Sequence, residues 1–371
     1  MIKLKRQIAL AKPDITDKEI EYVNQVLRSG ILSIGPKIEE FESMIAGYVG
    51  VKHAVAVNSG TSALHLIIKS LGIKEGDEVI TTPFSFVASA NCALFEKAVP
   101  VFVDIDEKTL NIDIDQIEEK ITDQTKAILV VDVFGQPLNI SRVKEIANKH
   151  NLYVIEDSCE ALGSIYQNTK AGSSADAAAF AFYPNKQITT AEGGMIVTNN
   201  DKVAELCRSM RSQGRAITGL WLYHERLGFN YRLSELHAAL GIAQMERIDE
   251  IIEKRNTAAS YYTERLKEIP WVRAPFIDPD VSRMSWFVYV IRVPEEIRND
   301  LIDYLKENGI SSKPYFTPIH LQPFYKEEFG YKPGDFPVTE KAGNECIAIP
   351  FYTNLTREEI DYVVDTIKSF K

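Results

Sequence analysis

Lys186 lies on a segment that suits an amine needing a fixed position. The segment runs from Phe182 to Val197 and places the lysine on a loop between two apolar runs that are predicted to be strands. Pro184 before the lysine and Gly193 after it favour a loop held by the sheet. Lysines that form Schiff bases require partial burial and neighbouring charges. The alternative is an ordinary solvated lysine.

An acid, Asp157, ends another apolar run. The run LYVIED, residues 152–157, is predicted to be a buried strand. Ligands in open α/β sheets bind outside the carboxyl ends of the strands, so Asp157 is well placed to meet one. The alternative is an acid that only caps the next helix.

A third segment suits an anion. Residues 57–64, VNSGTSAL, pass from a predicted strand through small residues into a predicted helix. The N–H groups at a helix start lack intrahelical partners and bind anions such as phosphate. Gly and Ser also occur in such turns for steric and capping reasons alone, so the turn is informative only together with the lysine and the acid.

A sheet is predicted to position these segments. From His53 to about Thr198, amphipathic helices separate the runs HAVAV, EVITT, PVFVDI, KAILVVDVF, LYVIED, AAAFAFY and GMIVTN. This alternation predicts an α/β fold with a mostly parallel sheet covered on both faces. Earlier in the chain, the spacing of Thr16 and Glu19 is that of a capping box, and it predicts a helix closed by Gly30.

The remainder predicts a second, smaller domain. A helical pattern from about Leu233 to Glu268 is expected to bridge the two domains. The tail is then predicted as strand, helix, strand and helix, in WFVYVIRV, EEIRNDLIDYLKENG, ISSKPYF and REEIDYVVDTIKSF. We therefore predict a large domain of residues 1–245 and a small α+β domain of residues 246–371. An alternative for the N-terminal segment is that it packs on the small domain.

Composition excludes several classes of protein. The 371 residues include 42 Lys and Arg against 52 Asp and Glu, a net charge of −10, which disfavours binding to nucleic acid or anionic membranes. No apolar run is long enough for a signal peptide or a membrane span, which predicts a cytoplasmic protein. Four scattered cysteines predict buried reduced thiols and no metal site, at Cys92, Cys159, Cys207 and Cys346.

Seven motifs, in this order, resemble those of the pyridoxal-phosphate-dependent nucleotide-sugar aminotransferases named after DegT, DnrJ, EryC and StrS. They are LRSGILSIGPKIEEFE, NSGTSALHL, TTPFSFVASAN, EDSCEALG, YPNKQITTAEGG, GFNYRLSELHAALG and YFTPIHLQPFY. The resemblance covers essentially the whole chain. It implies fold type I of the pyridoxal-phosphate-dependent transferases, with a large mixed, mostly parallel sheet domain and a smaller C-terminal domain.

The resemblance also implies a role for each matching residue. Lys186 would form the Schiff base with pyridoxal 5'-phosphate, and Asp157 would face the pyridine nitrogen and keep it protonated. Phe86 would stack on the ring, the alternative being a core phenylalanine. The remaining cofactor-binding residues would be Glu160 near the phenolic oxygen, the backbone of Gly60, Thr61 and Ser62 at the phosphate, and Asn230 from a second subunit.

Two positions depart from the family pattern. Ala181 stands where the family usually has a serine that binds the cofactor phosphate, and Glu160 stands where Gln or His is frequent. The first removes a phosphate contact, and the second replaces an amide by a carboxyl. Both bear on cofactor affinity more than on the type of reaction.

Substrate contacts are expected from charged and aromatic residues late in the chain. The resemblance implies that His320 and the GFNYR segment approach a neighbouring subunit's site in a homodimer. For His320 the alternative is a buried, hydrogen-bonded histidine. The full candidate set for the substrate is Arg215, Tyr231, Arg232, Lys313 and His320, and each cation among them could equally be a solvated surface charge.

The expected activity is transfer of an amino group from glutamate to a nucleotide-linked keto-sugar. Once the donor amine has displaced it, Lys186 would move the proton from Cα to the cofactor carbon as general base and acid. One alternative is a dehydratase of the same family, whose members carry histidine in place of the lysine. Another is a non-catalytic cofactor-binding regulator, which only Ala181 favours. A dinucleotide-binding dehydrogenase is set aside because no G-x-G-x-x-G turn follows the first strands.

Overall fold

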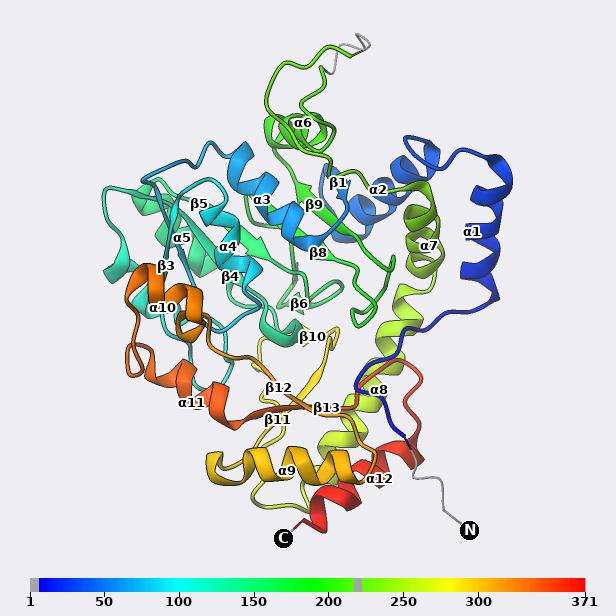
Figure 1. Cartoon of the computed structure of the whole chain (residues 1–371), viewed down its shortest axis with the longest axis vertical. Coiled ribbons are helices and arrows are strands. Elements are labelled where there is room, and N and C mark those ends of the chain that lie inside the picture. The colour runs from blue at the N-terminus through cyan, green and yellow to red at the C-terminus, as the bar shows by residue number, and fades with distance from the viewer. Residues whose placement is uncertain (1–6, 217–221, 371) are drawn as a thin grey trace.

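A seven-stranded sheet carries the segments singled out above (Figure 1). The computed structural model describes residues 7–216 and 222–370. The sheet order is β1-β9-β8-β5-β4-β2-β3. Its strands are β1 (His53–Val57), β2 (Glu78–Thr81), β3 (Val99–Phe102), β4 (Thr125–Val131), β5 (Tyr153–Asp157), β8 (Ala177–Ala181) and β9 (Gly194–Thr198). Only β9 runs antiparallel to its neighbours, so the predicted mostly parallel sheet is confirmed.

Helices cover both faces of this sheet, because alternate residues of each strand point to opposite sides. Val55 of β1 belongs to one core, whereas Ala54 and Ala56 belong to another. The first core is closed by α3 (Gly60–Ser70), α4 (Ala88–Leu94) and α6 (Asp201–Met210). The opposite face is closed by α2 (Pro36–Val49), α5 (Ile140–His150) and α7 (Glu235–Met245).

The first helix, α1 (Asp17–Ser29), has the predicted ends. Thr16 and Glu19 form a capping box, and Gly30 closes the helix at φ 71°, a left-handed conformation that glycine adopts without strain. Glu19 is buried and also accepts hydrogen bonds from Gln244 and Arg247. The capping acid therefore ties α1 to the end of α7.

A second sheet lies in the C-terminal part of the chain, with β13 (Cys346–Ile349) between β11 (Tyr289–Arg292) and β12 (Lys313–Pro314). Helices α9 (Glu295–Glu307) and α12 (Arg357–Lys368) pack with it around a separate core. The strand predicted in ISSKPYF is only two residues long, whereas β13 was not predicted. The other elements of this half are α10 (Pro323–Phe329), α11 (Pro337–Glu345) and β10 (Val281–Arg283), which pairs with β6 (Ile165–Tyr166), itself paired with β7 (Thr169–Lys170).

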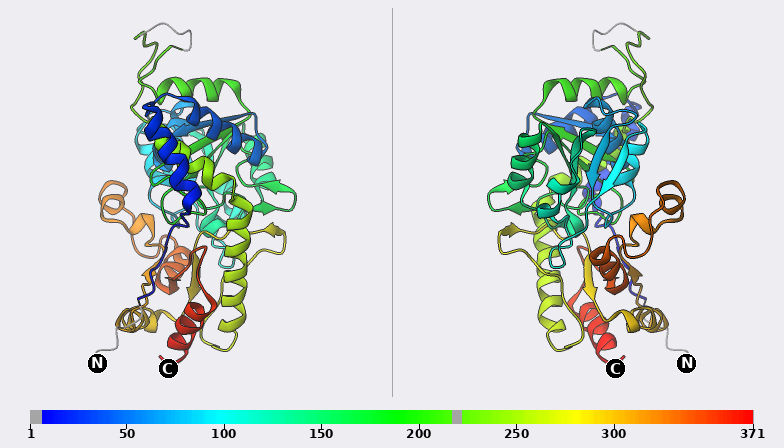
Figure 2. Two further views of the ribbon diagram at one scale, coloured as in Figure 1. Left: turned by 90° about the vertical axis from the view of Figure 1, so that its right-hand side faces the viewer. Right: turned by 90° about the vertical axis from the view of Figure 1, so that its left-hand side faces the viewer.

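The single helix predicted from Leu233 to Glu268 is wrong in one respect, because it is two helices. After α7 the chain leaves helical geometry at Arg247, and α8 (Ile248–Leu266) then runs toward the C-terminal elements (Figure 2). The Arg247 guanidinium binds Asp14 at 2.6 Å and Glu19 at 2.9 Å, which stabilises the break. The domain division at residues 245 and 246 stays a prediction, and it falls at this break.

The N-terminal segment packs against the C-terminal half. Ile8 is buried in the core of the second sheet and pairs with Ile310. The first six residues of this segment lie outside the described residues.

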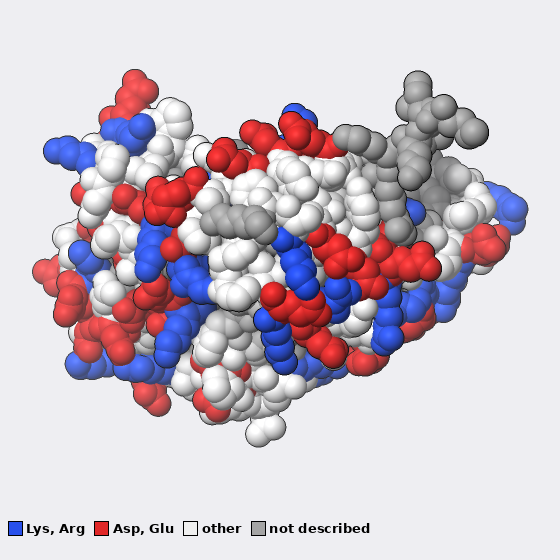
Figure 3. Space-filling model, turned by 90° about the horizontal axis from the view of Figure 1, so that it is seen from below, with Lys and Arg blue, Asp and Glu red and all other residues white. Residues whose placement is uncertain are grey.

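Charged side chains of both signs are interspersed on the face seen in Figure 3, without one large basic area. Within the described ranges, no helix combines the length and the apolar character needed to cross a membrane. The same residues contain no group of three potential metal ligands. All four cysteines are free thiols; three are buried, whereas Cys159 is only partly so.

Candidate active site

A cavity of about 420 Å³ lies where the large sheet meets the C-terminal half. The turn between β1 and α3 contributes Gly60 and Thr61, the end of β5 contributes Asp157, and the loop between β8 and β9 contributes Lys186. The three segments singled out in the sequence therefore border one space. The C-terminal half closes it with aromatic side chains, Phe287, Tyr315 and Phe316.

Lys186 is held inside this cavity. Its amide donates to the carbonyl of Tyr183 at 2.9 Å, which forms a turn after β8. The ammonium Nζ lies 3.4 Å from Oε1 of Glu160 and 3.9 Å from the ring centroid of Phe287. Only 13% of the side chain is exposed, so the solvated surface lysine is excluded.

Asp157 is buried at the end of β5, with 6% of the residue exposed. Its Oδ2 accepts a hydrogen bond from Ser89 Oγ at 2.6 Å, and its Oδ1 accepts one from the Cys159 amide at 3.2 Å. Both oxygens are thus fixed by donors from two elements. Asp157 does not cap a helix in the described structure, because no helix follows directly after β5.

Glu160 joins the lysine to the loop after β4. Its Oε2 accepts a hydrogen bond from the amide of Phe134 at 2.9 Å, and Oε1 faces Lys186. Burial raises the pKa of Glu160 above its ordinary value, and the charge of Lys186 partly offsets this effect. The carboxyl is therefore easier to protonate than one on the surface.

The turn before α3 presents backbone N–H groups to the cavity. Ser59 is the N-cap, and its hydroxyl accepts from the Ser62 amide at 3.1 Å. Gly60 and Thr61, the first two residues of α3, line the cavity, whereas Ser62 does not. A Cβ atom on Gly60 would lie 2.8 Å from Cβ of Ala181, so this glycine lets β8 and the turn approach each other closely.

Two further features show that the cavity can accept a planar, polar ligand. Phe86 is 63% exposed and lines the cavity, so the core-phenylalanine alternative is excluded. The side-chain Oδ1 of Asn185 is buried against the cavity and has no hydrogen-bond partner among the described residues. A buried acceptor without a partner is costly unless a ligand or water supplies a donor.

The GFNYR segment does not line the cavity of its own chain, although it lies beside the turn before α3, where the Tyr231 carbonyl accepts from the Asn58 amide at 2.9 Å. Asn230 pairs with Ser212 and is exposed, and Tyr231 stacks on Phe229 with ring centroids 4.9 Å apart. Arg232 donates to Gln213 at 2.7 Å. Arg215 also belongs to this region, where its backbone carbonyl accepts from Ser209. None of these four predicted residues lines the Lys186 cavity in one chain.

The last two predicted substrate residues also lie outside the cavity. Lys313 is an exposed residue of β12. His320 is fully buried, with Nε2 3.1 Å from Oε1 of Glu340 and its ring against Phe336. It is therefore the buried, hydrogen-bonded histidine that was the alternative to a substrate contact.

Several lining residues were not predicted from the sequence. Ser89 lies three residues after Phe86, in the first turn of α4, within the quoted motif TTPFSFVASAN, which could have indicated it. Tyr315, Phe316 and Asn185 fall within quoted motifs but had no role assigned. Phe287 carried no signal of its own in the sequence.

A buried lysine and an oriented aspartate across one cavity, on a mostly parallel sheet, define an enzyme of the pyridoxal-phosphate-dependent transferase fold. The chain belongs to the DegT/DnrJ/EryC1/StrS aminotransferase family, whose model matches residues 13–368. The resemblance noted in the sequence is thereby confirmed, and the protein is an aminotransferase.

Individual relatives match over nearly their whole lengths. GDP-perosamine synthase of Escherichia coli O157:H7 is 36% identical over 98% of this chain and 99% of its own. The spore coat polysaccharide biosynthesis protein SpsC of Bacillus subtilis is 38% identical over 96% of this chain and 95% of its own. The solved structure of Helicobacter pylori PseC, an aminotransferase of pseudoaminic acid biosynthesis, aligns with a TM-score of 0.93 at 32% identity, covering 98% of this chain and 99% of that one.

Proposed function

We propose that the protein transfers an amino group from glutamate to a keto-sugar linked to a nucleoside diphosphate, with pyridoxal 5'-phosphate as its cofactor. The observation that carries the proposal is the meeting of Lys186, Asp157 and the Gly60 turn at one cavity. Relatives named for GDP-perosamine synthesis and pseudoaminic acid biosynthesis support a sugar nucleotide as the acceptor.

The residues around the cavity fit this cofactor. The free amides of Gly60 and Thr61 suit its phosphate, because a helix N-terminus favours an anion. The exposed face of Phe86 suits its ring. Asn185 offers an acceptor that the chain itself does not satisfy. Ala181 brings no hydroxyl to the phosphate, so the backbone amides carry more of that interaction.

The bound cofactor would supply an electron sink for the carbanion that forms when an amino acid loses its Cα proton. Asp157, fixed by Ser89, would hold a proton on the facing ring nitrogen. Lys186 Nζ would bind the cofactor covalently when no substrate is present, and then take up and return the Cα proton. Glu160 would hold Nζ in position.

We also propose a homodimer in which each subunit completes the other's site. These four residues belong to one region that does not line the cavity of the same chain: Asn230, Tyr231, Arg232 and Arg215. A two-fold arrangement would let that region reach a neighbouring subunit's cavity. The cytoplasmic location expected from the sequence stays a prediction.

The visible absorption spectrum of the protein with pyridoxal phosphate, before and after glutamate, tests the proposal. We expect a yellow band that glutamate bleaches, and no such band in Lys186→Ala. Lys144→Ala is the matched control, because Lys144 is also held by a carbonyl, that of Ser174, but lies outside the cavity. A band that no amino acid bleaches would favour the dehydratase or the non-catalytic alternative. Absence of any band would refute the proposal that the protein binds pyridoxal phosphate through a Schiff base.

A further inference from the structure

A second pocket, of about 360 Å³, lies between loops at the carboxyl end of the large sheet and the C-terminal half of the chain. Residues 107–110, after β3, and residues 133–136, after β4, contribute to one wall, whereas residues 273–276 and β11 contribute to the other. We call this space the Arg273 pocket. Among the described residues it shares none of its lining with the Lys186 cavity. Its volume suits a small organic ligand.

The lining of the Arg273 pocket has an excess of positive charge. It includes three cations, Lys108, Arg273 and Arg292, against one carboxylate, that of Glu107. This carboxylate is already paired, since Nζ of Lys341 lies 2.7 Å from its Oε1. In a chain whose net charge is −10, such a local excess of cations favours binding of an anion.

The two arginines lie directly opposite each other. Arg273 and Arg292 pair as an antiparallel bridge through backbone hydrogen bonds of 2.8 and 2.9 Å. Like charges in such a pair are destabilising unless a counter-charge lies near them. Both guanidiniums bind the carboxylate of Glu345, which accepts from Nε of Arg292 at 2.9 Å. One carboxylate balances only one of the two arginines, so with Lys108 two positive charges remain.

The rest of the lining is largely apolar. Phe276 is 43% exposed and lines the pocket together with Leu110, Pro275, Met284 and Val290. A ligand that fits therefore combines an anionic group with a planar or apolar body. A phosphomonoester carries about −1.5 to −2 charges at neutral pH, which matches the unbalanced cations better than a carboxylate does. Arginine also binds phosphate through paired hydrogen bonds.

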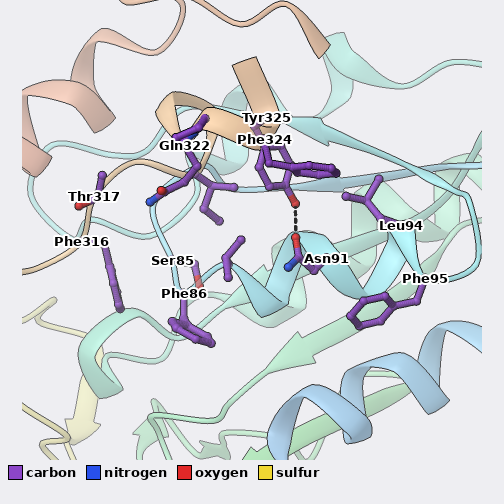
Figure 4. Close-up of a pocket in the computed structure, with 13 residues that line it drawn as sticks. Ser85, Phe86, Asn91, Leu94, Phe95, Phe316, Thr317, Gln322, Phe324 and Tyr325 are labelled. Carbon is purple, nitrogen blue, oxygen red and sulfur yellow. Dashed lines mark hydrogen bonds between the residues drawn. The ribbon is translucent and has the colours of Figure 1, made fainter. Parts of the chain in front are cut away.

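Phe134 connects the Arg273 pocket to the Lys186 cavity. It lines the pocket, and its amide donates to Oε2 of Glu160 at 2.9 Å. Its ring stacks on the ring of Phe316, with centroids 5.3 Å apart. Phe316 in turn lines the Lys186 cavity and the groove beside it that Figure 4 shows. A ligand that contacts Phe134 in the pocket is therefore one residue away from two groups of the cavity.

We propose that the Arg273 pocket is a regulatory site for a phosphomonoester with a planar or apolar body, coupled to the Lys186 cavity through Phe134. A bound ligand would hold Phe134 in place, and the Phe134 amide would then hold Glu160 beside Lys186. Ligand binding should therefore tighten binding of the cofactor. The coupling rests on the proposed function, whereas the binding of the phosphomonoester does not.

Calorimetry on the cofactor-loaded protein tests the binding, with phenyl phosphate and inorganic phosphate as probes. We expect phenyl phosphate to bind more tightly, because only it has a planar body. Arg273→Gln should weaken its binding roughly tenfold or more through loss of charged hydrogen bonds. Phe276→Ala should weaken binding of phenyl phosphate but not of inorganic phosphate. The matched control is Arg265→Gln, since Arg265 also pairs with carboxylates but lies outside the pocket.

Equilibrium dialysis tests the coupling. We expect saturating phenyl phosphate to lower the Kd for pyridoxal phosphate roughly fivefold in the wild type, and to leave it unchanged in Arg273→Gln. A higher Kd in both proteins would contradict the coupling, because it would mean that phenyl phosphate competes for the phosphate position of the cofactor.

The outcomes separate the site from the proposed function. Equal binding of phenyl phosphate by the wild type, Arg273→Gln and Phe276→Ala would overturn the site. Binding that depends on Arg273 without any change in cofactor affinity would overturn the regulatory role. If the protein forms no visible band with pyridoxal phosphate but still binds phenyl phosphate through Arg273, the proposed function fails and the site stands. Urea unfolding of each variant verifies that it is folded.

Discussion

Nζ of Lys186 lies 3.4 Å from Oε1 of Glu160, in a cavity that leaves both side chains largely out of water. The ammonium therefore has a carboxyl partner on one side and the ring of Phe287 on the other. Since the second oxygen of Glu160 is bound by the Phe134 amide, the carboxyl cannot turn away without losing a hydrogen bond. The position of Lys186 Nζ is thus set by three elements at once.

This pairing predicts an acid limb in the pH profile of the visible band. Burial raises the pKa of Glu160, so the carboxyl gains its proton and loses its charge as the pH falls through that raised value. Below it the ion pair with Lys186 is lost, and we expect weaker cofactor retention. In Glu160→Gln, which keeps an acceptor for Phe134, this limb should be absent, whereas Glu192→Gln should keep it. Retention of the limb in Glu160→Gln would assign it to another group.

A buried pair of acids beneath the site predicts stability that falls with rising pH. Asp132 and Glu156 are both buried, and the one hydroxyl hydrogen of Ser158 is within reach of an oxygen of each, Asp132 Oδ2 at 2.8 Å and Glu156 Oε1 at 3.1 Å. The other oxygens, Asp132 Oδ1 and Glu156 Oε2, have no hydrogen-bond partner among the described residues. Burial, then the charge of Glu156, raises the pKa of Asp132 well above its ordinary value, and burial raises that of Glu156. Because the folded pKa values exceed the unfolded ones, the stabilising protonated form is lost as the pH rises through the raised values.

Asp132→Asn tests this pair. Two buried acids side by side favour one proton held between them, and the asparagine amide supplies a permanent donor in its place. We therefore expect the free energy of unfolding in urea to rise by roughly 1–3 kcal/mol at pH 8.5 and by much less at pH 5.5. Asp104→Asn is the matched control, because the buried Asp104 accepts from the amides of Val338 and Thr339 and should lose stability at both pH values. A variant no more stable than the wild type at pH 8.5 would contradict a shared proton.

Gly60 lies so close to Ala181 and Cys159 that a side chain at this position should lower both stability and cofactor affinity. In Gly60→Ala the new methyl group would lie 2.8 Å from Cβ of Ala181 and 3.0 Å from Sγ of Cys159. We expect roughly 1–3 kcal/mol of lost stability from overpacking, and a drop in pyridoxal phosphate affinity measured by equilibrium dialysis. Adding Ala181→Gly should recover part of both losses. No recovery in the double variant would show that the contact with Cys159 dominates.

Arg255 should affect Lys186 indirectly, because it holds the backbone of Phe287. It is buried, and it donates to the carbonyls of Trp286 at 2.7 Å and of Phe287 at 2.7 Å. Lysine cannot reach both carbonyls with its single nitrogen, so Arg255→Lys should lower the free energy of unfolding by roughly 2–4 kcal/mol. It should also weaken cofactor retention, since the Phe287 ring lies against Lys186.

The control for this prediction is Arg265→Lys. Arg265 pairs with Asp361 and Asp365 near the surface, so we expect a change within about 0.5 kcal/mol, in line with exposed ion pairs. Equal losses in the two variants would mean that the carbonyl contacts of Arg255 contribute little.

Much of the fold was predictable because its signals are local. The capping box at Thr16 and Glu19, and the apolar runs of the large sheet, depend on neighbouring residues alone. The strand β13 was missed because it is only four residues long and is fully buried, so no alternation marks it. The break at Arg247 was missed for another reason, since its partner Asp14 lies far away in the sequence.

By itself, the sequence determined the seven main strands, the helices between them, and the candidate site residues Lys186 and Asp157. It also indicated the family through seven ordered motifs. These features follow from residue type and short-range spacing, which any segment carries with it. They do not depend on where the C-terminal half of the chain lies.

Only the tertiary structure decided which side chains surround the lysine. Phe134 and Phe287 come from two separate elements, and nothing in their own segments marks them as partners of Glu160 or Lys186. It also separated His320 and Lys313 from the cavity, although the chain carries both in or beside a motif of the family. The reason is physical: contacts between distant segments depend on how the sheet, α8 and the second core pack together, and that packing is not encoded in any one stretch of residues.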